Sequence, residues 1–247
     1  MFEINDDPDM ILVSKIGIEN RNALIIDDFY KNPDEVRQYA LDSPKKTKET
    51  DPGLLSGLSG SRVFEQDSRV KDKMKSFFDE LSKEPIWNSP RNFESQWYDD
   101  NWNKIGFMCN ITNQKSMDVG GGIPHQDSFD NRFGSVIYLN TPEECQGGTR
   151  IYSYFGAIGF YQADMIDSDP NKRWVEPQSF KDNMNEITMH RWKNHHQNEP
   201  DEGWKVEAEF EMKYNRCILY EADVLHGIWQ EPDMFIDYDR IAQVLFM

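Results

Sequence analysis

Residues 216–226 read RCILYEADVLH, a short apolar run followed by a turn and a histidine. A second apolar run, RIAQVLF, occupies residues 240–246 and opens on an arginine. Earlier runs of similar length, broken by Gly, Asn and Asp, begin after Ser89-Pro90. They are Lys104 to Thr112, Phe133 to Leu139, Thr149 to Tyr154 and Trp204 to Met212. Successive short runs of this kind predict an antiparallel barrel or sandwich.

The first third of the chain predicts a mixture of strand and helix. Ala23 to Ile26 is an apolar strand, and Asn32-Pro33 starts a helix that has acidic residues in its first turn. A second helix is expected from Ser68 to Leu81, where apolar residues recur at helical spacing. Gly53 to Gly60 reads as a loop between the two helices.

The length of 247 residues predicts one domain, because a mainly β core with flanking helices reaches this size. We expect residues 1–90 to form an N-terminal α+β segment packed on a β barrel made by residues 91–247. Residues 162–203 interrupt the strand pattern and contain good helix formers. This excursion either overhangs the mouth of a pocket or packs on the outside.

The charge of the chain narrows the class of partner. The formal net charge is -17 and the isoelectric point is about 4.7. Nucleic acids and anionic membranes select for basic patches, so a small molecule or a peptide substrate is expected instead. The acidic start MFEINDDPDM is unlike a signal peptide, and no apolar stretch is long enough to span a bilayer. These features predict a soluble, cytoplasmic protein and leave its oligomeric state open.

The three cysteines do not suggest a disulfide framework or a zinc site. Cys109, Cys145 and Cys217 are odd in number and form no CxxC pair. We expect them to be small buried hydrophobic residues.

Candidate metal ligands come from two places in the sequence. His125 and Asp127 follow a glycine loop, and residues two apart in an extended segment point the same way. His226 follows on a separate, late strand. Two imidazoles and one carboxylate on one face leave the rest of an Fe(II) ion open for a bidentate co-substrate and O₂. The alternative is a hydrogen-bonded histidine in a loop, with an unrelated acid nearby.

Arg240 is a charged residue at the start of an otherwise apolar strand, which calls for an explanation. A bidentate partner for the far carboxylate of 2-oxoglutarate is one such explanation. The alternative is a surface ion pair with Asp237 or Asp239, which would contribute little to stability.

The order of these motifs resembles that in the 2-oxoglutarate/Fe(II)-dependent dioxygenase superfamily. Within it, the sequence is similar to the prolyl-hydroxylase-like branch and to uncharacterised members. The matching pieces are His125-Gln126-Asp127, Val136-Ile137-Tyr138-Leu139-Asn140, Gly147-Gly148-Thr149, His226, Arg240 and the N-terminal Ile25 to Phe29 with Asn32-Pro33. The resemblance covers about Phe107 to Phe246. It implies a mainly β fold with flanking helices and a double-stranded β-helix, or jelly-roll, core with iron bound at its open end.

Two departures from the family pattern restrict what carries over. Along the sequence, Arg240 is farther from His226 than the equivalent cation is in many prolyl hydroxylases. The substrate of those enzymes therefore cannot be assigned to this chain. Relatives place a co-substrate tyrosine on the strand matching Ile105 to Thr112, where this chain has Cys109 and Asn110. Tyr138 is the substitute candidate if its side chain faces inward.

The resemblance implies a hydroxylase that uses Fe(II), 2-oxoglutarate and O₂. Such an enzyme oxidises an unactivated C–H bond of a peptide, amino acid or small metabolite and releases succinate and CO₂. His125, Asp127 and His226 would hold the iron, and Arg240 with Tyr138 would hold the co-substrate. The alternative is a cupin-like module that binds a metal or small acid without turnover, although a cupin has no need of Arg240 at this place.

Overall fold

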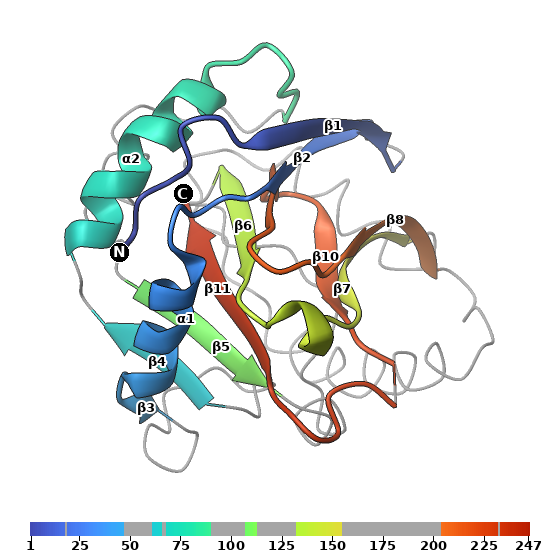
Figure 1. Cartoon of the computed structure of the whole chain (residues 1–247). Helices are drawn as coiled ribbons and strands as arrows, with labels where there is room; N and C mark the ends of the chain where they lie inside the picture. Colours follow the sequence, from blue (N-terminus) through green and yellow to red (C-terminus); the bar gives the residue numbers. More distant parts are fainter. Residues whose placement is uncertain are drawn as a thin grey trace, which may run out of the picture.

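The computed structural model describes residues 1–17, 19–46, 61–65, 68–89, 107–112, 132–154, 204–231 and 233–247. These residues form a large sheet and a small sheet, with helices on the outer side of the large one (Figure 1). The expected mainly β composition with flanking helices is confirmed. No helix among the described residues is long and apolar enough to cross a membrane.

The N-terminal segment adds both strands and a helix to this framework. The hairpin strands β1 (Asp9–Ile16) and β2 (Arg21–Asp27) pair antiparallel, and α1 (Pro33–Asp42) follows them. α1 begins where the sequence predicts, because proline is favoured in the first turn and acidic residues there interact favourably with the helix dipole. Strand β2 lies where an apolar strand was expected. Strand β1 was not predicted.

The second helix, α2 (Ser68–Ser82), also lies at its predicted position. Before it, β3 (Lys45–Lys46) and β4 (Ser61–Glu65) form the edge of the large sheet next to β5 (Phe107–Thr112). The expected loop at Gly53 to Gly60 lies outside the described residues.

The large sheet contains eight strands in the order β1-β2-β9-β6-β11-β5-β4-β3. Its central strands are β6 (Phe133–Tyr138), β9 (Cys217–Glu221) and β11 (Arg240–Phe246), all within runs that the sequence predicts. β11 pairs antiparallel with both β5 and β6, so β5 and β6 run parallel to each other.

The small sheet has the order β10-β7-β8 among the described residues. It consists of β7 (Gly148–Tyr154), β8 (Trp204–Glu211) and β10 (Leu225–Trp229), and a 3-10 turn, η1 (Pro142–Glu144), precedes β7. A side chain at Gly148 would lie 1.9 Å from the Phe210 carbonyl oxygen, so glycine is required at this position. Residues 162–203, where a helical excursion was predicted, lie outside the described residues.

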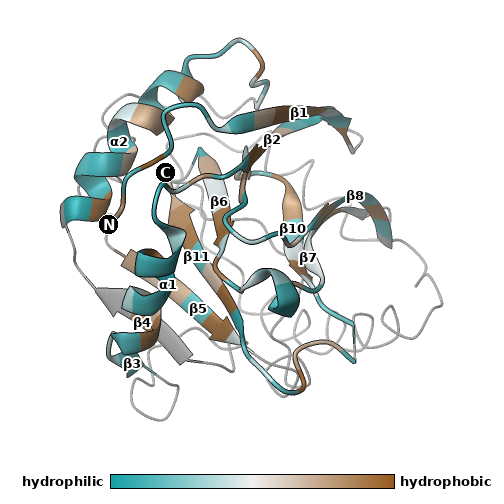
Figure 2. Ribbon diagram, viewed as in Figure 1, coloured by the Kyte–Doolittle hydropathy of each residue, from teal (hydrophilic) through white to brown (hydrophobic). Residues whose placement is uncertain are grey.

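Two hydrophobic clusters lie on opposite faces of the large sheet. One joins odd-numbered residues of β6, β9 and β11 to the apolar sides of α1 and α2. The other lies between the sheets and includes Tyr138, Ala242 and Tyr220 from the large sheet with Ile151 and Phe210 from the small one. In Figure 2 the apolar residues stand out in β11 and part of β6 of the large sheet. Functional side chains that point between the sheets therefore share one interior.

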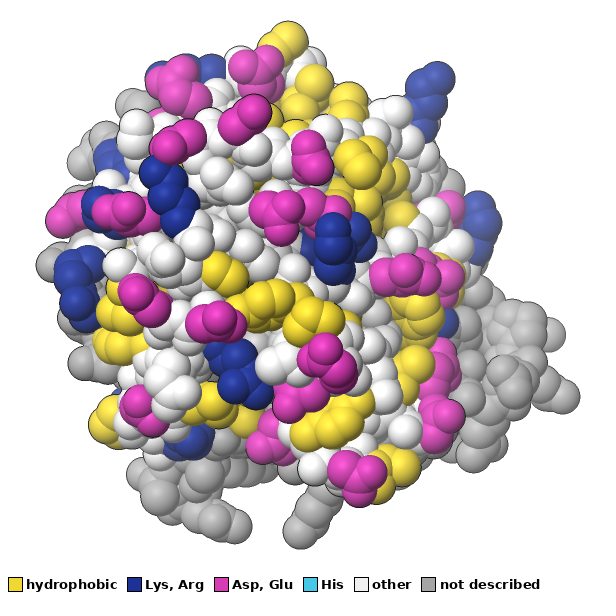
Figure 3. Space-filling model, viewed as in Figure 1, with side chains coloured by type: hydrophobic (Ala, Val, Ile, Leu, Met, Phe, Trp, Pro, Cys, Tyr) yellow, Lys and Arg dark blue, Asp and Glu magenta, His cyan; other side chains and the backbone are white. Residues whose placement is uncertain are grey.

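The exterior carries charged side chains together with patches of hydrophobic ones (Figure 3). On the face drawn in Figure 3, acidic and basic side chains are interspersed. Cys109 and Cys217 are buried as expected, whereas Cys145 is half-buried, and all three are free thiols.

Candidate functional site

Arg240 is the first residue of β11 and is directly opposite Thr112, the last residue of β5. Both residues are 2% exposed. The alternative interpretation of Arg240, a surface ion pair with a neighbouring aspartate, is therefore wrong. The guanidinium carbon lies 5.5 Å from the ring centroid of Tyr138, a cation–π contact with β6.

The charge of Arg240 is not neutralised by any described carboxylate. Its Nε atom is buried without a hydrogen-bond partner, and so is the Oγ1 atom of Thr112. Burial lowers the pKa of the guanidinium, and the neighbouring Tyr138 phenol opposes that shift. A buried cation without a counter-ion is costly, and native proteins satisfy nearly all their buried polar atoms. Two such atoms on facing residues fit the binding of an anion.

The side chain of Tyr138 faces inward, as is required if Tyr138 is to contact the co-substrate. It is fully buried in the cluster between the sheets, on the same face of the large sheet as Ala242. Its hydroxyl forms a 2.7 Å hydrogen bond with Oγ1 of Thr149 in the small sheet. Burial raises the pKa of Tyr138, so the phenol is neutral at physiological pH. Tyr138 therefore links the two sheets and forms one wall beside Arg240.

His226 lies on β10 and is 5% exposed. Its Nδ1 atom is 3.1 Å from the Val224 carbonyl oxygen, and its ring centroid is 4.5 Å from that of Tyr220. A carbonyl oxygen accepts hydrogen bonds, so this contact favours the tautomer with the proton on Nδ1. The lone pair of the ring is then on Nε2, as in a histidine that binds a metal through that atom.

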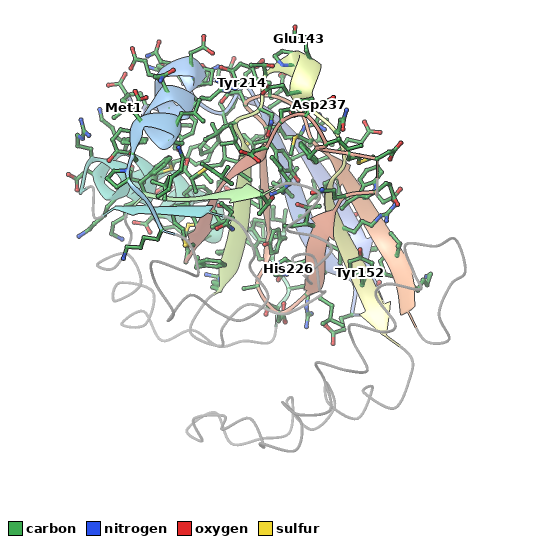
Figure 4. The ribbon with its side chains drawn as sticks, turned by 90° about the horizontal axis from the view of Figure 1, so that it is seen from below. Met1, Glu143, Tyr152, Tyr214, His226 and Asp237 are labelled. Carbon is green, nitrogen blue, oxygen red and sulfur yellow. The ribbon has the colours of Figure 1, made fainter. Side chains whose placement is uncertain are left out.

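Tyr220 connects the His226 end of the interior with the Arg240 end. Its ring packs against the imidazole at a tilt of 47°, and its phenol is near enough to Arg240 to affect the pKa of the guanidinium. Figure 4 shows His226 and Tyr152 at one end of the two-sheet core, with Glu143 and Asp237 at the other. The imidazole is carried by β10 and the guanidinium by β11, and Tyr220 is a residue that interacts with both.

The turn that carries His226 is held by buried ion pairs and hydrogen bonds. Nη2 of Arg21 in β2 lies 2.9 Å from Oδ2 of Asp223, and the Ser89 hydroxyl donates to the same oxygen at 2.9 Å. Glu221 accepts a hydrogen bond of 3.0 Å from the Asn22 backbone N–H. Burial raises the pKa of the Glu221 carboxyl, although the backbone donors around it oppose that shift. These contacts fix the end of β9 from which the chain turns to His226.

The other two predicted metal ligands, His125 and Asp127, lie outside the described residues. No group of three or more His, Cys, Asp or Glu within the described part of the chain could hold a metal ion. The Ala222 N–H donates to the Arg132 carbonyl at 2.9 Å, which places Arg132 beside the turn to His226.

Thr112 and Tyr220 are the candidate site residues that the sequence did not indicate. Thr112 ends a predicted strand, but its alignment with Arg240 depends on a pairing between residues far apart in the chain. Tyr220 is part of an apolar run in which a tyrosine reads as core. No local signal distinguishes either residue from its neighbours.

Comparison with known proteins yields a matching family model and distant structural likenesses, one of which is described here. The model of a family described as a family of unknown function, DUF6445, matches residues 103–235. A solved structure of an N-substituted L-amino acid dioxygenase from Burkholderia ambifaria aligns over 98% of this chain and 95% of its own, with a TM-score of 0.38 and 9% identity. No curated protein matches the sequence.

Proposed function

The chain belongs to the DUF6445 family, a family of unknown function, and we propose that it is an Fe(II)- and 2-oxoglutarate-dependent oxygenase. The observation that carries the proposal is the buried Arg240 guanidinium, which has no described carboxylate partner and faces the unsatisfied hydroxyl of Thr112. The C5 carboxylate of 2-oxoglutarate would supply both with charge-assisted hydrogen bonds.

The order of the strands supports a double-stranded β-helix for the core. The central strands β9-β6-β11-β5 would form one sheet of the jelly roll, and β10-β7-β8 three strands of the other. A fourth strand beside β10 would complete it.

His125, Asp127 and His226 would hold the iron in a two-histidine, one-carboxylate face. The tautomer of His226 fits this role, as does the position of Arg132 close to the turn that carries His226. When bound, Fe(II) with 2-oxoglutarate supplies the means to activate O₂ and oxidise a C–H bond, with release of succinate and CO₂.

The described residues have three tasks in this proposal. Arg240 and Thr112 bind and orient the far end of the co-substrate, and Tyr138 closes the wall beside them. The apolar cluster between the sheets excludes water, which strengthens the electrostatic attraction between Arg240 and the carboxylate. Tyr220 packs its ring against the imidazole of His226. The substrate proposed is a peptide, amino acid or small metabolite.

Anaerobic titration with Fe(II) and 2-oxoglutarate tests metal, co-substrate and geometry together. A weak visible charge-transfer band should appear only when both are present, and each should tighten the binding of the other, because the linkage between two ligands is reciprocal. Asp127→Ala and His226→Ala should abolish the band and the release of succinate.

A rise in melting temperature with Fe(II) provides the second measurement, since a ligand that binds the native state stabilises it. If the wild-type protein shows neither this rise nor succinate formation, the oxygenase proposal fails. A small acid that still stabilises the protein through Arg240 would then favour the cupin-like binding module.

A further inference from the structure

A glutamate on β8 has a buried carboxylate oxygen that no described residue satisfies. The side chain of Glu207 is 9% exposed, and its Oε1 atom is buried without a hydrogen-bond partner among the described residues. The other oxygen, Oε2, accepts a hydrogen bond of 2.9 Å from Nζ of Lys205, whose side chain is 62% exposed. A buried polar atom is costly unless it is hydrogen-bonded. Oε1 is therefore an acceptor that suits the N–H group of a ligand.

A β-bulge sets the position of Glu207. Ile151 of β7 pairs with Ala208 of β8, whereas the next residue, Tyr152, pairs with Val206. Glu207 is thus the extra residue of the bulge. Bulges redirect a side chain and are frequent beside active sites.

The Glu207 side chain meets the hydroxyl of Ser153 from β7. A Cβ atom built on Gly17, between β1 and β2, would lie 3.1 Å from Oγ of Ser153 and 3.6 Å from Cγ of Glu207. The two side chains therefore approach the same point beside the β1–β2 hairpin. Ser153 is buried as well, so the pair offers two oxygen acceptors away from bulk water.

The inward-facing residues of β7 place this pair relative to the proposed site. Thr149 bonds the tyrosine that lies beside Arg240, and Ile151 pairs with His226. Residues two apart on a strand point the same way and are about 7 Å apart. Ser153 therefore faces the interior one step beyond the His226 row, on the side away from Arg240. Figure 4 shows His226 at this end of the core.

We propose that Glu207, together with Ser153, binds a protonated amino group of the substrate. This inference rests on the proposed function, in which 2-oxoglutarate fills the space between Arg240 and the iron and leaves the Ser153 side to the substrate. An ammonium group would donate a charge-assisted hydrogen bond to Oε1 of Glu207 and a second bond to Oγ of Ser153.

The charge of the molecule favours a cation over a neutral donor. The net charge of -17 attracts positively charged ligands. The ion pair between Glu207 and Lys205 is weak because the lysine is exposed and solvent screens its charge. The proposed substrate class is accordingly an amino acid or a peptide with a free amino group.

The first measurement is the binding of n-butylammonium to the protein without metal or 2-oxoglutarate, followed by saturation-transfer NMR. Neutral n-butanol should bind at least about tenfold more weakly, because a hydrogen bond to a charged group is the stronger one. Glu207→Gln keeps the shape of the side chain, removes its charge and should weaken n-butylammonium binding by about tenfold. Equal binding of the two probes, or no effect of Glu207→Gln, would overturn the proposal.

Glu209→Gln is the matched control for the loss of one negative charge. Glu209 lies on the same strand, is 45% exposed and pairs with Nη2 of Arg150 at 2.8 Å. This variant should bind n-butylammonium as the wild type does. Equal weakening by Glu209→Gln and Glu207→Gln would mean that only the overall charge attracts the amine, and the site would be refuted.

The second measurement locates the amine relative to the metal. Mn(II), which suits imidazole and carboxylate ligands, is added with 2-oxoglutarate, and the n-butylammonium signals should broaden in the wild type but not in Glu207→Gln. His226→Ala should abolish the broadening and leave amine binding intact. If Mn(II) binds and the bound amine is not broadened, Glu207 does not serve the substrate. If Mn(II) does not bind, the proposed function fails and the substrate role of Glu207 fails with it.

Discussion

Replacing Arg240 by Met should stabilise the protein in the absence of ligands and abolish its response to 2-oxoglutarate. The guanidinium is 2% exposed and its Nε atom has no partner, so the native state bears the cost of desolvating it. Exchanging buried charges for apolar side chains of similar size is neutral or stabilising, by about 1–4 kcal/mol. Loss of the contact with the Tyr138 ring offsets about 0.5–2 kcal/mol of this, so the midpoints of the two ranges leave a net gain of about 1 kcal/mol.

Thermal unfolding measures this gain. For a chain of this length, 1 kcal/mol corresponds to about 2–4 °C in melting temperature. Without co-substrate, Arg240→Met should melt above the wild type. With Fe(II) and a 100-fold excess of 2-oxoglutarate over its Kd under anaerobic conditions, the wild type should gain about 2.7 kcal/mol and the order should reverse.

Arg216→Met is the matched control. The guanidinium of Arg216 contacts both carboxylate oxygens of Asp27, at 2.6 and 2.9 Å, so its loss should destabilise the protein by about 1–3 kcal/mol and leave the 2-oxoglutarate response intact. If Arg240→Met melts below the wild type without ligand, the charge is already compensated. If 2-oxoglutarate stabilises Arg240→Met as much as it stabilises the wild type, Arg240 does not bind it.

Three further variants test other contacts. Thr112→Val keeps the shape of the side chain and should weaken 2-oxoglutarate binding by about 0.5–1.5 kcal/mol without loss of stability in urea; unchanged affinity would remove Thr112 from the site. Tyr138→Phe leaves the buried Thr149 hydroxyl without its partner and should cost about 1–3 kcal/mol in urea unfolding; an unchanged midpoint would contradict the hydrogen bond. The Arg216 hydrogen bond lowers the pKa of Asp27, so its stabilisation is present above pH 3.8 and lost as pH falls through the folded-state pKa. Asp27→Asn should therefore destabilise the protein at pH 7 and make little difference at the acid end, and a difference independent of pH would exclude this linkage.

Most strands could be predicted because a strand buried on both faces is apolar over its length. β6, β9 and β11 lie within such runs, and proline after Asn32 gives the start of α1. β1 and β10 were missed for different reasons. β1 contains the apolar run Met10 to Val13, which was not read as a strand, and β10 contains Gly227 and was read as the end of the preceding run.

The sequence alone determined which residue types are available for chemistry: a late histidine, an arginine opening an apolar strand, and a tyrosine that would serve if it pointed inward. The tertiary structure decided that Tyr138 does point inward, that Arg240 is buried without a described counter-ion, and that Thr112 lies directly opposite it. The reason is physical. Strand composition reflects local burial, whereas register depends on pairing between segments distant in the chain, and a shift of one residue would turn each of these side chains to the other face of the sheet.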